Sequence, residues 1–377
     1  MNTCSTRRQF IQYAMLGLSY LALPRTGFSL PATLNKKLYL DKSYNVEIPE
    51  GSSIRIVAES NKQVLNSSPY PWHSAPDGGA CFATNNNGWI YVSNSEIEKQ
   101  DGGVGAIRFN RGGDIIDAYS ILKNTSRNCA GGKTPWNTWL SCEEYGDIGQ
   151  VYECDPEGKR RAQVRPLMGS FNHEAAAVDP LSGVCYMTED RKDGCLYRFR
   201  PDKKGDLSAG MLEVAIANRN VLSWKKIEDP SGNIRPVRYQ IEEAARFKGG
   251  EGIIYFDRQV FFTTKRDNAV WQYYIDTGLI SKIYDASDYQ LPLLTGVDNI
   301  EVSPSGELLI AEDGGNMQII ALDHDYQPHV LVQIYGQNKS EITGPAFSPD
   351  GKRLYFSSQR GKTGKSENGI TYEIRFG

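Results

Sequence analysis

The chain has 377 residues, of which 40% are hydrophobic, so it can bury a large core in one large fold or in two domains. Its 42 basic and 45 acidic residues give a net charge of -3 and are spread along the chain, without the concentrated basic patch that a phosphate backbone requires. We therefore expect no nucleic acid among its partners. The 21 Tyr, 13 Phe and 37 Gly residues, together with little helical periodicity, favour an all-β fold.

The N-terminal segment has the form of a twin-arginine export signal. Arg7 and Arg8 precede the apolar run "YAMLGLSYLAL", which is shorter than the roughly 20 residues that span a membrane. The alternative is a buried or membrane-spanning helix. We predict that residues 1–33 are a signal peptide read by the twin-arginine export machinery and that residues 34–377 form a single domain. The mature protein is then periplasmic or secreted.

Six later segments each combine a tight turn with a short strand-forming run. Their turn markers are Gly88, Asn137, Gly183, Arg258, Gly306 and Gly351, at intervals of 49, 46, 75, 48 and 45 residues. All but one interval match the roughly 40 to 50 residues of a four-stranded propeller blade, and the long one holds an inserted segment around residues 201–248. Two β-sandwiches would give shorter and less regular intervals. We predict a six-bladed β-propeller in which "SSIRIVAES" and "GITYEIRF" share or flank a blade.

Polar side chains recur six to eight residues after the turn markers, where the following strand ends. They are Asn94, Glu143 with Glu144, Glu189 with Asp190, Lys265 followed by Asp267, Glu312 with Asp313, and Gln359 with Arg360. Because equivalent positions of successive blades converge on the propeller axis, these acids are expected to meet there. Like charges at such separations repel by several kcal/mol even at an effective dielectric of about 20, and hard cations such as calcium, magnesium or ferric iron offset that repulsion. The alternative is that each acid pair caps a turn or faces solvent.

Three further stretches hold candidate ligands. Cys129 precedes a glycine pair in "NCAGGKTPW" and is either a small buried hydrophobe or a ligand. "SFNHEAAAVDP" contains His173 and Glu174 without the second histidine of a zincin motif, and "GGEG" places Glu251 between glycines, as a crowded carboxylate or at a simple bulge. The chain has four histidines and no GxSxG elbow, so a Ser-His-Asp hydrolase is poorly supported. Metal-assisted hydrolysis is the chemistry that these residues permit.

Several motifs resemble the PhoX family of exported alkaline phosphatases and related proteins. They are "NCAGGKTPWNTWLSCEE", "FNHEAAAVDPLSGVCYMTED", "GGEG", "DNIEVSPSGELLIAEDGG" and "ITGPAFSPDGKRLYFSSQ", in that order. The resemblance implies a six-bladed propeller that hydrolyses phosphomonoesters with an axial cluster of iron (Fe3+) and calcium (Ca2+). It also implies metal ligands: Cys129 as a thiolate to iron, Glu144, Glu174 and Glu251 as carboxylates, and Glu143, Glu189 and Asp190 as further acids of the site.

The chain departs from the family pattern at two places. Gly249 stands where the family carries an arginine, and Gln359 is followed by Arg360 and Gly361 instead of His-Pro-Gly. The resemblance therefore predicts that Lys248, Arg246 or Arg360 contacts the phosphate of a small-molecule phosphomonoester. We expect a monomer. Two other functions stay open: a non-catalytic metal-binding propeller, and a calcium-dependent hydrolase of the lactonase kind, which would have no use for Cys129.

Overall fold

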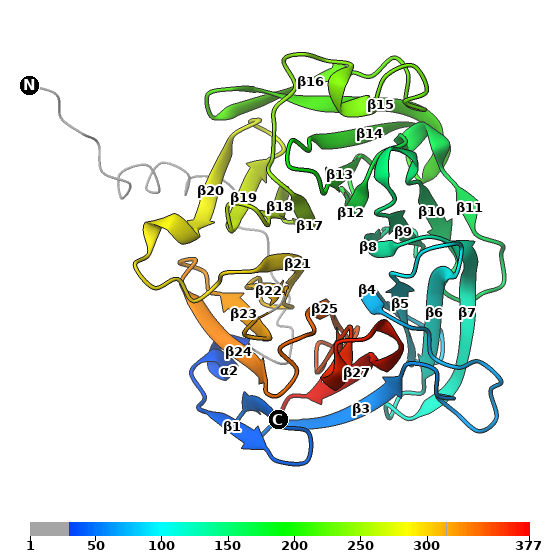
Figure 1. Cartoon of the computed structure of the whole chain (residues 1–377), viewed down its shortest axis with the longest axis vertical. Coiled ribbons are helices and arrows are strands. Elements are labelled where there is room, and N and C mark those ends of the chain that lie inside the picture. Colours follow the sequence, from blue (N-terminus) through cyan, green and yellow to red (C-terminus); the bar gives the residue numbers. More distant parts are fainter. Residues whose placement is uncertain (1–29, 314) are drawn as a thin grey trace, which may run out of the picture.

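The strands form six antiparallel sheets that surround a common axis as the blades of a propeller (Figure 1). The structure is a computed structural model that describes residues 30–313 and 315–377. The predicted all-β, six-bladed propeller is confirmed. Residues 1–29, which carry most of the predicted export signal, lie outside the described residues. Within the described part of the chain, no helix is long and apolar enough to cross a membrane.

The first three blades follow one another along the chain, and each begins with the strand nearest the axis. Blade I consists of β4 (Pro76–Ala83), β5 (Trp89–Ser95), β6 (Gly102–Phe109) and β7 (Ile115–Thr125). Blade II consists of β8 (Asn128–Lys133), β9 (Trp139–Glu143), β10 (Val151–Cys154) and β11 (Gln163–Val164). Blade III has five strands: β12 (His173–Val178), β13 (Cys185–Glu189), β14 (Leu196–Lys203), β15 (Asp206–Asn218) and β16 (Val221–Lys226). The segment predicted as an insertion thus contains β15, β16 and the connection that returns from β16 to the axis.

The last three blades complete the ring and include the N-terminal strands. Blade IV consists of β17 (Gly250–Phe256), β18 (Gln259–Thr264), β19 (Ala269–Tyr274) and β20 (Ile280–Asp285). Blade V consists of β21 (Val297–Val302), β22 (Leu308–Glu312), β23 (Gln318–Leu322) and β24 (Pro328–Ile334), extended by β2 (Val46–Pro49) and β1 (Leu38–Asp41). Blade VI consists of β25 (Ile342–Phe347), β26 (Arg353–Ser358), β27 (Ile370–Arg375) and β3 (Ser53–Glu59).

The two ends of the described chain close the ring in blade VI, as the sequence predicted. Strand β3 pairs antiparallel with β27 over the register from Ser53↔Arg375 to Glu59↔Ile370. The short helix α2 (Leu30–Leu34) lies beside blade V, where Leu30 is fully buried and its backbone N–H donates to Ser305 Oγ at 3.2 Å. Because α2 overlaps the end of the predicted signal, cleavage after residue 33 would remove Leu30 from the core. The boundary at residue 33 stays a prediction.

The core is divided into six hydrophobic clusters, each between two neighbouring blades. Strand β5 shows how one strand serves two of them: Trp89 and Tyr91 pack toward blade VI, and Ile90 and Val92 pack toward blade II. Successive side chains of a strand point to opposite faces, so a strand with both faces covered reads as a continuous apolar run. This packing holds the strand ends at the axis in fixed positions.

Candidate active site

The strand nearest the axis in every blade contains a bulge close to its start. The pairing register with the second strand shifts there in all six blades, and a bulge of this kind re-aims a side chain. The residues at this position, called the bulge ring below, are Asp77, Cys129, Glu174, Glu251, Asp298 and Gly344. The six inner strands contact their neighbours around the axis, so four carboxyl groups and one thiol are brought together there.

A second ring, called the rim ring below, lies directly after the second strand of each blade. Its members are Glu96, Glu144, Asp190, Lys265, Asp313 and Gln359. The predicted recurrence of polar residues at the end of the second strand of each blade is therefore confirmed. In blade I the predicted residue was Asn94, whereas Glu96 occupies the equivalent position.

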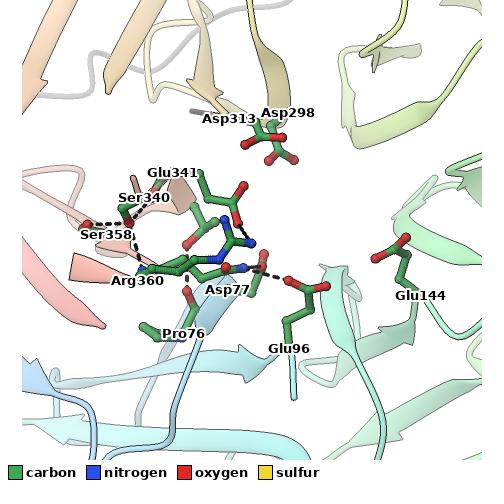
Figure 2. A network of polar contacts seen from close by, with 12 residues as sticks. Pro76, Asp77, Glu96, Glu144, Asp298, Asp313, Ser340, Glu341, Ser358 and Arg360 are labelled. Carbon is green, nitrogen blue, oxygen red and sulfur yellow. Dashed lines mark hydrogen bonds and ion pairs between the residues drawn. The ribbon is translucent and has the colours of Figure 1, made fainter. Parts of the chain in front are cut away.

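The two rings and Glu341 form four overlapping groups of acid or thiol side chains. In each group the possible ligand atoms lie within 4.8 Å of one another. The groups are Asp77, Glu96 and Cys129; Cys129, Glu144 and Glu174; Glu174, Glu251 and Asp298; and Asp298, Asp313 and Glu341. Figure 2 shows Asp298, Asp313 and Glu341 facing Glu96 and Glu144 across one shared space. Of the sequence-predicted ligands, Cys129, Glu144, Glu174 and Glu251 are thus brought together.

Burial and mutual repulsion dominate the electrostatics of these groups. Burial, followed by the charges of Glu251 and Asp298, raises the pKa of Glu174 well above its ordinary value. The pKa of Asp298 is raised to about 7, mainly by burial. The charge of Lys265 lowers this pKa, and the charge of Asp313 raises it. The pKa of the Cys129 thiol is raised by burial and by Asp77 and Glu174. Without cations, the cluster therefore favours protonated side chains.

Three side chains of the protein already supply positive charge around the cluster. Arg127 Nη2 contacts Glu96 at 2.9 Å and Glu144 at 2.6 Å. Lys265 Nζ lies 2.6 Å from Asp313 and 3.7 Å from Glu251. Arg360 Nη2 pairs with Glu341 at 2.8 Å, a contact that Figure 2 also shows. These contacts position the outer acids and reach Glu251, whereas Asp77, Glu174 and Asp298 form no ion pair with a basic side chain among the described residues.

Unpartnered oxygens at the centre fit a metal site. Oε1 of Glu174 and Oε1 of Glu251 are buried and have no hydrogen-bond partner among the described residues, and the same holds for Oδ1 of Asp190. Glu174 is 1% exposed and Glu251 is 2% exposed, so water does not readily compensate either carboxylate. Several hard oxygen ligands and one thiolate, all aimed at one space, are a donor set that binds multivalent cations.

Glu143 and Glu189 lie one residue before rim-ring positions and point away from the cluster. The carboxylate of Glu143 accepts from the backbone N–H groups of Ser126 at 2.9 Å and Gln150 at 3.1 Å. Glu189 accepts from the Cys195 N–H and the Tyr197 hydroxyl and pairs with Arg238 at 3.1 Å. Adjacent strand residues face opposite sides, so each predicted acid pair contains one axial acid and one acid that holds a loop. The structure does not bring Glu143 and Glu189 to the metal ligands.

Asn94 positions the bulge that carries Cys129. Its Nδ2 donates to the carbonyls of Cys129 at 3.1 Å and Ala130 at 2.6 Å, and its Oδ1 accepts from Trp139 Nε1 at 2.9 Å. The buried Trp139 therefore fixes an amide that in turn fixes the backbone of a candidate ligand. Such support orients metal ligands in proteins.

Residues 102–269 match the family model described as "Alkaline phosphatase PhoX". The matched segment contains Cys129, Glu144, Glu174 and Glu251. The predicted resemblance to the PhoX family is confirmed. Comparison with curated protein sequences gave no match.

Solved structures with the same fold include a PhoX. PhoX of Pseudomonas fluorescens, in complex with vanadate, a transition state analogue, is 16% identical with a TM-score of 0.73, covering 88% of this chain and 96% of that chain. A gluconolactonase of Xanthomonas campestris is 10% identical with a TM-score of 0.54, covering 90% of this chain and 94% of that chain. These likenesses establish the propeller fold.

The three basic residues predicted from the PhoX resemblance to contact phosphate lie in different surroundings. Arg246 donates to the Asp193 carbonyl at 3.1 Å and to Cys195 Sγ at 3.1 Å, and Lys248 is exposed. Only Arg360 borders the cluster, paired with Glu341. The space beside Gly249 is taken by another arginine: a Cβ at Gly249 would lie 3.2 Å from Arg266 Cγ and 3.1 Å from Asp190 Oδ1. The phosphate-binding roles of Arg246, Lys248 and Arg360 stay predictions.

Four acids of the cluster were not predicted from the sequence: Asp77, Glu96, Asp298 and Glu341. The first and third begin "DGGACF" and "DNIEVS", which share with "EAAAVD" and "EGIIYF" an acid followed by glycine, alanine or asparagine near the start of an inner strand. Aligning the inner strands on that pattern would have found both aspartates. Glu341 precedes β25, outside both repeating positions, and no repeat in the sequence indicates it.

Proposed function

We propose that the protein is a metal-dependent phosphomonoesterase that releases phosphate from small organic phosphate esters at the axial cluster. The observation that carries the proposal is the convergence of Cys129, Glu144, Glu174 and Glu251, all within the segment that matches the PhoX family, on one space with unpartnered buried oxygens.

The chemistry of the donor sets supports a division of the cations between iron and calcium. We assign ferric iron to the two groups that contain Cys129, because a thiolate suits a transition metal and a bound metal lowers the pKa of the thiol. The two groups made only of carboxylates, which share Asp298, suit calcium, which prefers oxygen ligands. Bound cations supply Lewis-acid polarisation of the phosphoryl group and lower the pKa of a coordinated water.

The protein's own side chains hold and expose this centre. Arg127 fixes Glu144 through its carboxylate, and Asn172 Nδ2 donates to the other oxygen of Glu144 at 2.9 Å. On the side of Glu144 and Asp190, an open cavity of about 740 Å³ leads to solvent and admits an ester and its leaving group. Preorganised charge of this kind is the main contribution a protein makes to phosphoryl transfer.

A substrate panel on protein of measured metal content tests the proposal. We expect hydrolysis of p-nitrophenyl phosphate, no hydrolysis of glucono-δ-lactone, and iron and calcium both present by elemental analysis. Lactone hydrolysis without phosphatase activity would indicate the lactonase alternative. A metal-loaded protein with neither activity would indicate the non-catalytic alternative.

We further propose that the protein is exported by the twin-arginine machinery and acts as a monomer in the periplasm or outside the cell. The observation behind the proposed export is the sequence of residues 1–33. Cell fractionation should place the protein outside the cytoplasm, and replacing both Arg7 and Arg8 with lysine should retain it inside. Light scattering of the purified protein should give the mass of one chain.

A further inference from the structure

The cavity beside the axial cluster is lined by five basic side chains: Arg127, Arg191, Lys192, Arg238 and Arg266. It is also lined by five acidic side chains: Glu98, Glu144, Asp147, Asp190 and Asp193. The two sets are equal in number, so the formal charges of the lining cancel. They are unevenly distributed, however, and basic side chains outnumber acidic ones along one wall.

Two of the arginines, Arg127 and Arg238, form ion pairs with four of the five acids. Arg127 contacts Glu98 at 3.3 Å as well as Glu144. Arg238, which is 8% exposed, contacts Asp147 at 2.5 Å and Asp193 at 3.8 Å. These ion pairs are structural, because they join segments that surround the cavity.

Arg191, Lys192 and Arg266 form no ion pair or side-chain hydrogen bond with any residue in the described ranges, and they face only one remaining acid, Asp190. We call these three residues the cationic wall. Nε of Arg191 is buried and has no hydrogen-bond partner among the described residues. A bound anion would supply the acceptor that this guanidinium lacks. The charges of Arg266 and Arg191 act on Asp190, which places them beside the rim ring.

Backbone contacts through Gly249 hold the wall in place. Gly249 N donates to the Arg191 carbonyl at 2.8 Å, and the Gly249 carbonyl accepts from Lys265 N at 2.8 Å. Arg266 N donates to the Lys248 carbonyl at 3.2 Å. Gly249 has a φ of +71°, and it leaves room for Arg266 next to Asp190, as the short Cβ distances above show. The wall is thus built into three linked segments.

We propose that the cationic wall binds a second anionic group of the substrate, a carboxylate or phosphate, while the scissile phosphate lies at the axial cluster. This inference rests on the proposed phosphatase function and names its substrate class: compact phosphomonoesters with a further negative group. Two guanidinium groups offer forked, charge-assisted donors to carboxylate or phosphate oxygens. Arg191 is half-buried and Arg266 and Lys192 are exposed, so this attraction is screened by salt.

The test compares two esters that differ by one carboxylate, glycerol 3-phosphate and 3-phosphoglycerate, on the metal-loaded full chain. We expect kcat/KM to be at least tenfold higher for 3-phosphoglycerate, chiefly through KM, with an advantage that shrinks as salt is raised. In the double variant Arg191→Gln, Arg266→Gln the ratio should approach one, and Lys192→Glu should lower it in part. Arg111→Gln, an exposed arginine in the β6–β7 turn away from the cavity, is the control for loss of charge and should leave the ratio unchanged.

Each other outcome overturns the proposal in a recognisable way. Equal losses of kcat/KM for both esters in the double variant would mean that the wall contacts the scissile phosphate, and an unchanged kcat/KM for each ester would mean that it contacts no substrate. If neither ester is hydrolysed, the proposed function fails, and calorimetric titration with the same two esters still tests the wall. Equal affinities for the two esters would then overturn it, and tighter binding of 3-phosphoglycerate that is lost in the double variant would support it.

Discussion

Replacing Glu174 with glutamine should have opposite effects on stability with and without metals. Possible ligand atoms of Glu174, Glu251 and Asp298 lie within 4.8 Å of one another. At that separation two unit charges repel by about 3.5 kcal/mol at an effective dielectric of 20. Oε1 of Glu174 has no hydrogen-bond partner to lose among the described residues. Because partial protonation already relieves some repulsion, we expect Glu174→Gln to raise the free energy of unfolding of chelated protein at pH 8 by about 1 to 3 kcal/mol.

With cations bound, the same substitution removes a ligand and should lower the free energy of unfolding. Urea denaturation at pH 8, with chelator and then with iron and calcium, measures both effects. Glu143→Gln is the control, because its carboxylate accepts two backbone N–H groups and its replacement should destabilise both forms by about 1 to 3 kcal/mol. A loss of stability for Glu174→Gln in the chelated protein would show that this carboxylate serves the fold, and would refute the reasoning.

Three further predictions concern the same cluster. Cys129→Ala should lose iron while the fold is retained, as measured by elemental analysis and circular dichroism; full iron occupancy would contradict its assignment as a ligand. Glu144→Gln should lower metal content whereas Glu143→Gln should not, and equal metal losses in the two variants would show that both acids bind cations. Finally, the chelated protein should become less stable as the pH rises from 5 to 8. Carboxyl groups whose pKa is raised in the folded state stabilise it below their unfolded pKa, near 4, and lose that contribution as the pH passes the folded value, about 7 for Asp298. A melting temperature that stays constant or rises over this range would contradict the raised pKa values.

The propeller was predictable because each blade begins with the same local sequence pattern, a tight turn between two strands. Turn residues such as Asn137, with φ of +62°, and Gly183, with φ of +79°, recur at blade spacing because each first hairpin needs a left-handed residue. Closure was predicted in outline, because the strands at Ser53–Glu59 and Ile370–Arg375 were expected to share or flank a blade, and they pair in blade VI.

The candidate site was predictable only in part, because its ligands come from bulges as well as strand ends. Counting from turns identifies Glu144 but cannot tell it from Glu143, since that choice depends on the face each side chain takes at the end of β9. Cys129, Glu174 and Glu251 were open candidates from their local motifs, and resemblance to a family assigned them as ligands. Asp298, which was missed, occupies the same bulge position as these three residues. The position of Arg266 beside the cluster could not be predicted from the sequence. It depends on Gly249, which lies 17 residues earlier in the sequence and is adjacent in space.

We propose that the axial cluster is the metal centre of a phosphatase. The most direct test of this proposal is the release of p-nitrophenol from p-nitrophenyl phosphate by protein of known metal content, before chelation, after chelation and after iron and calcium are restored. We expect turnover that disappears with the metals, returns with them, and stays absent in Glu174→Gln. Turnover that survives complete removal of metal, or its absence from fully loaded protein, would show that the cluster is not the catalytic metal centre.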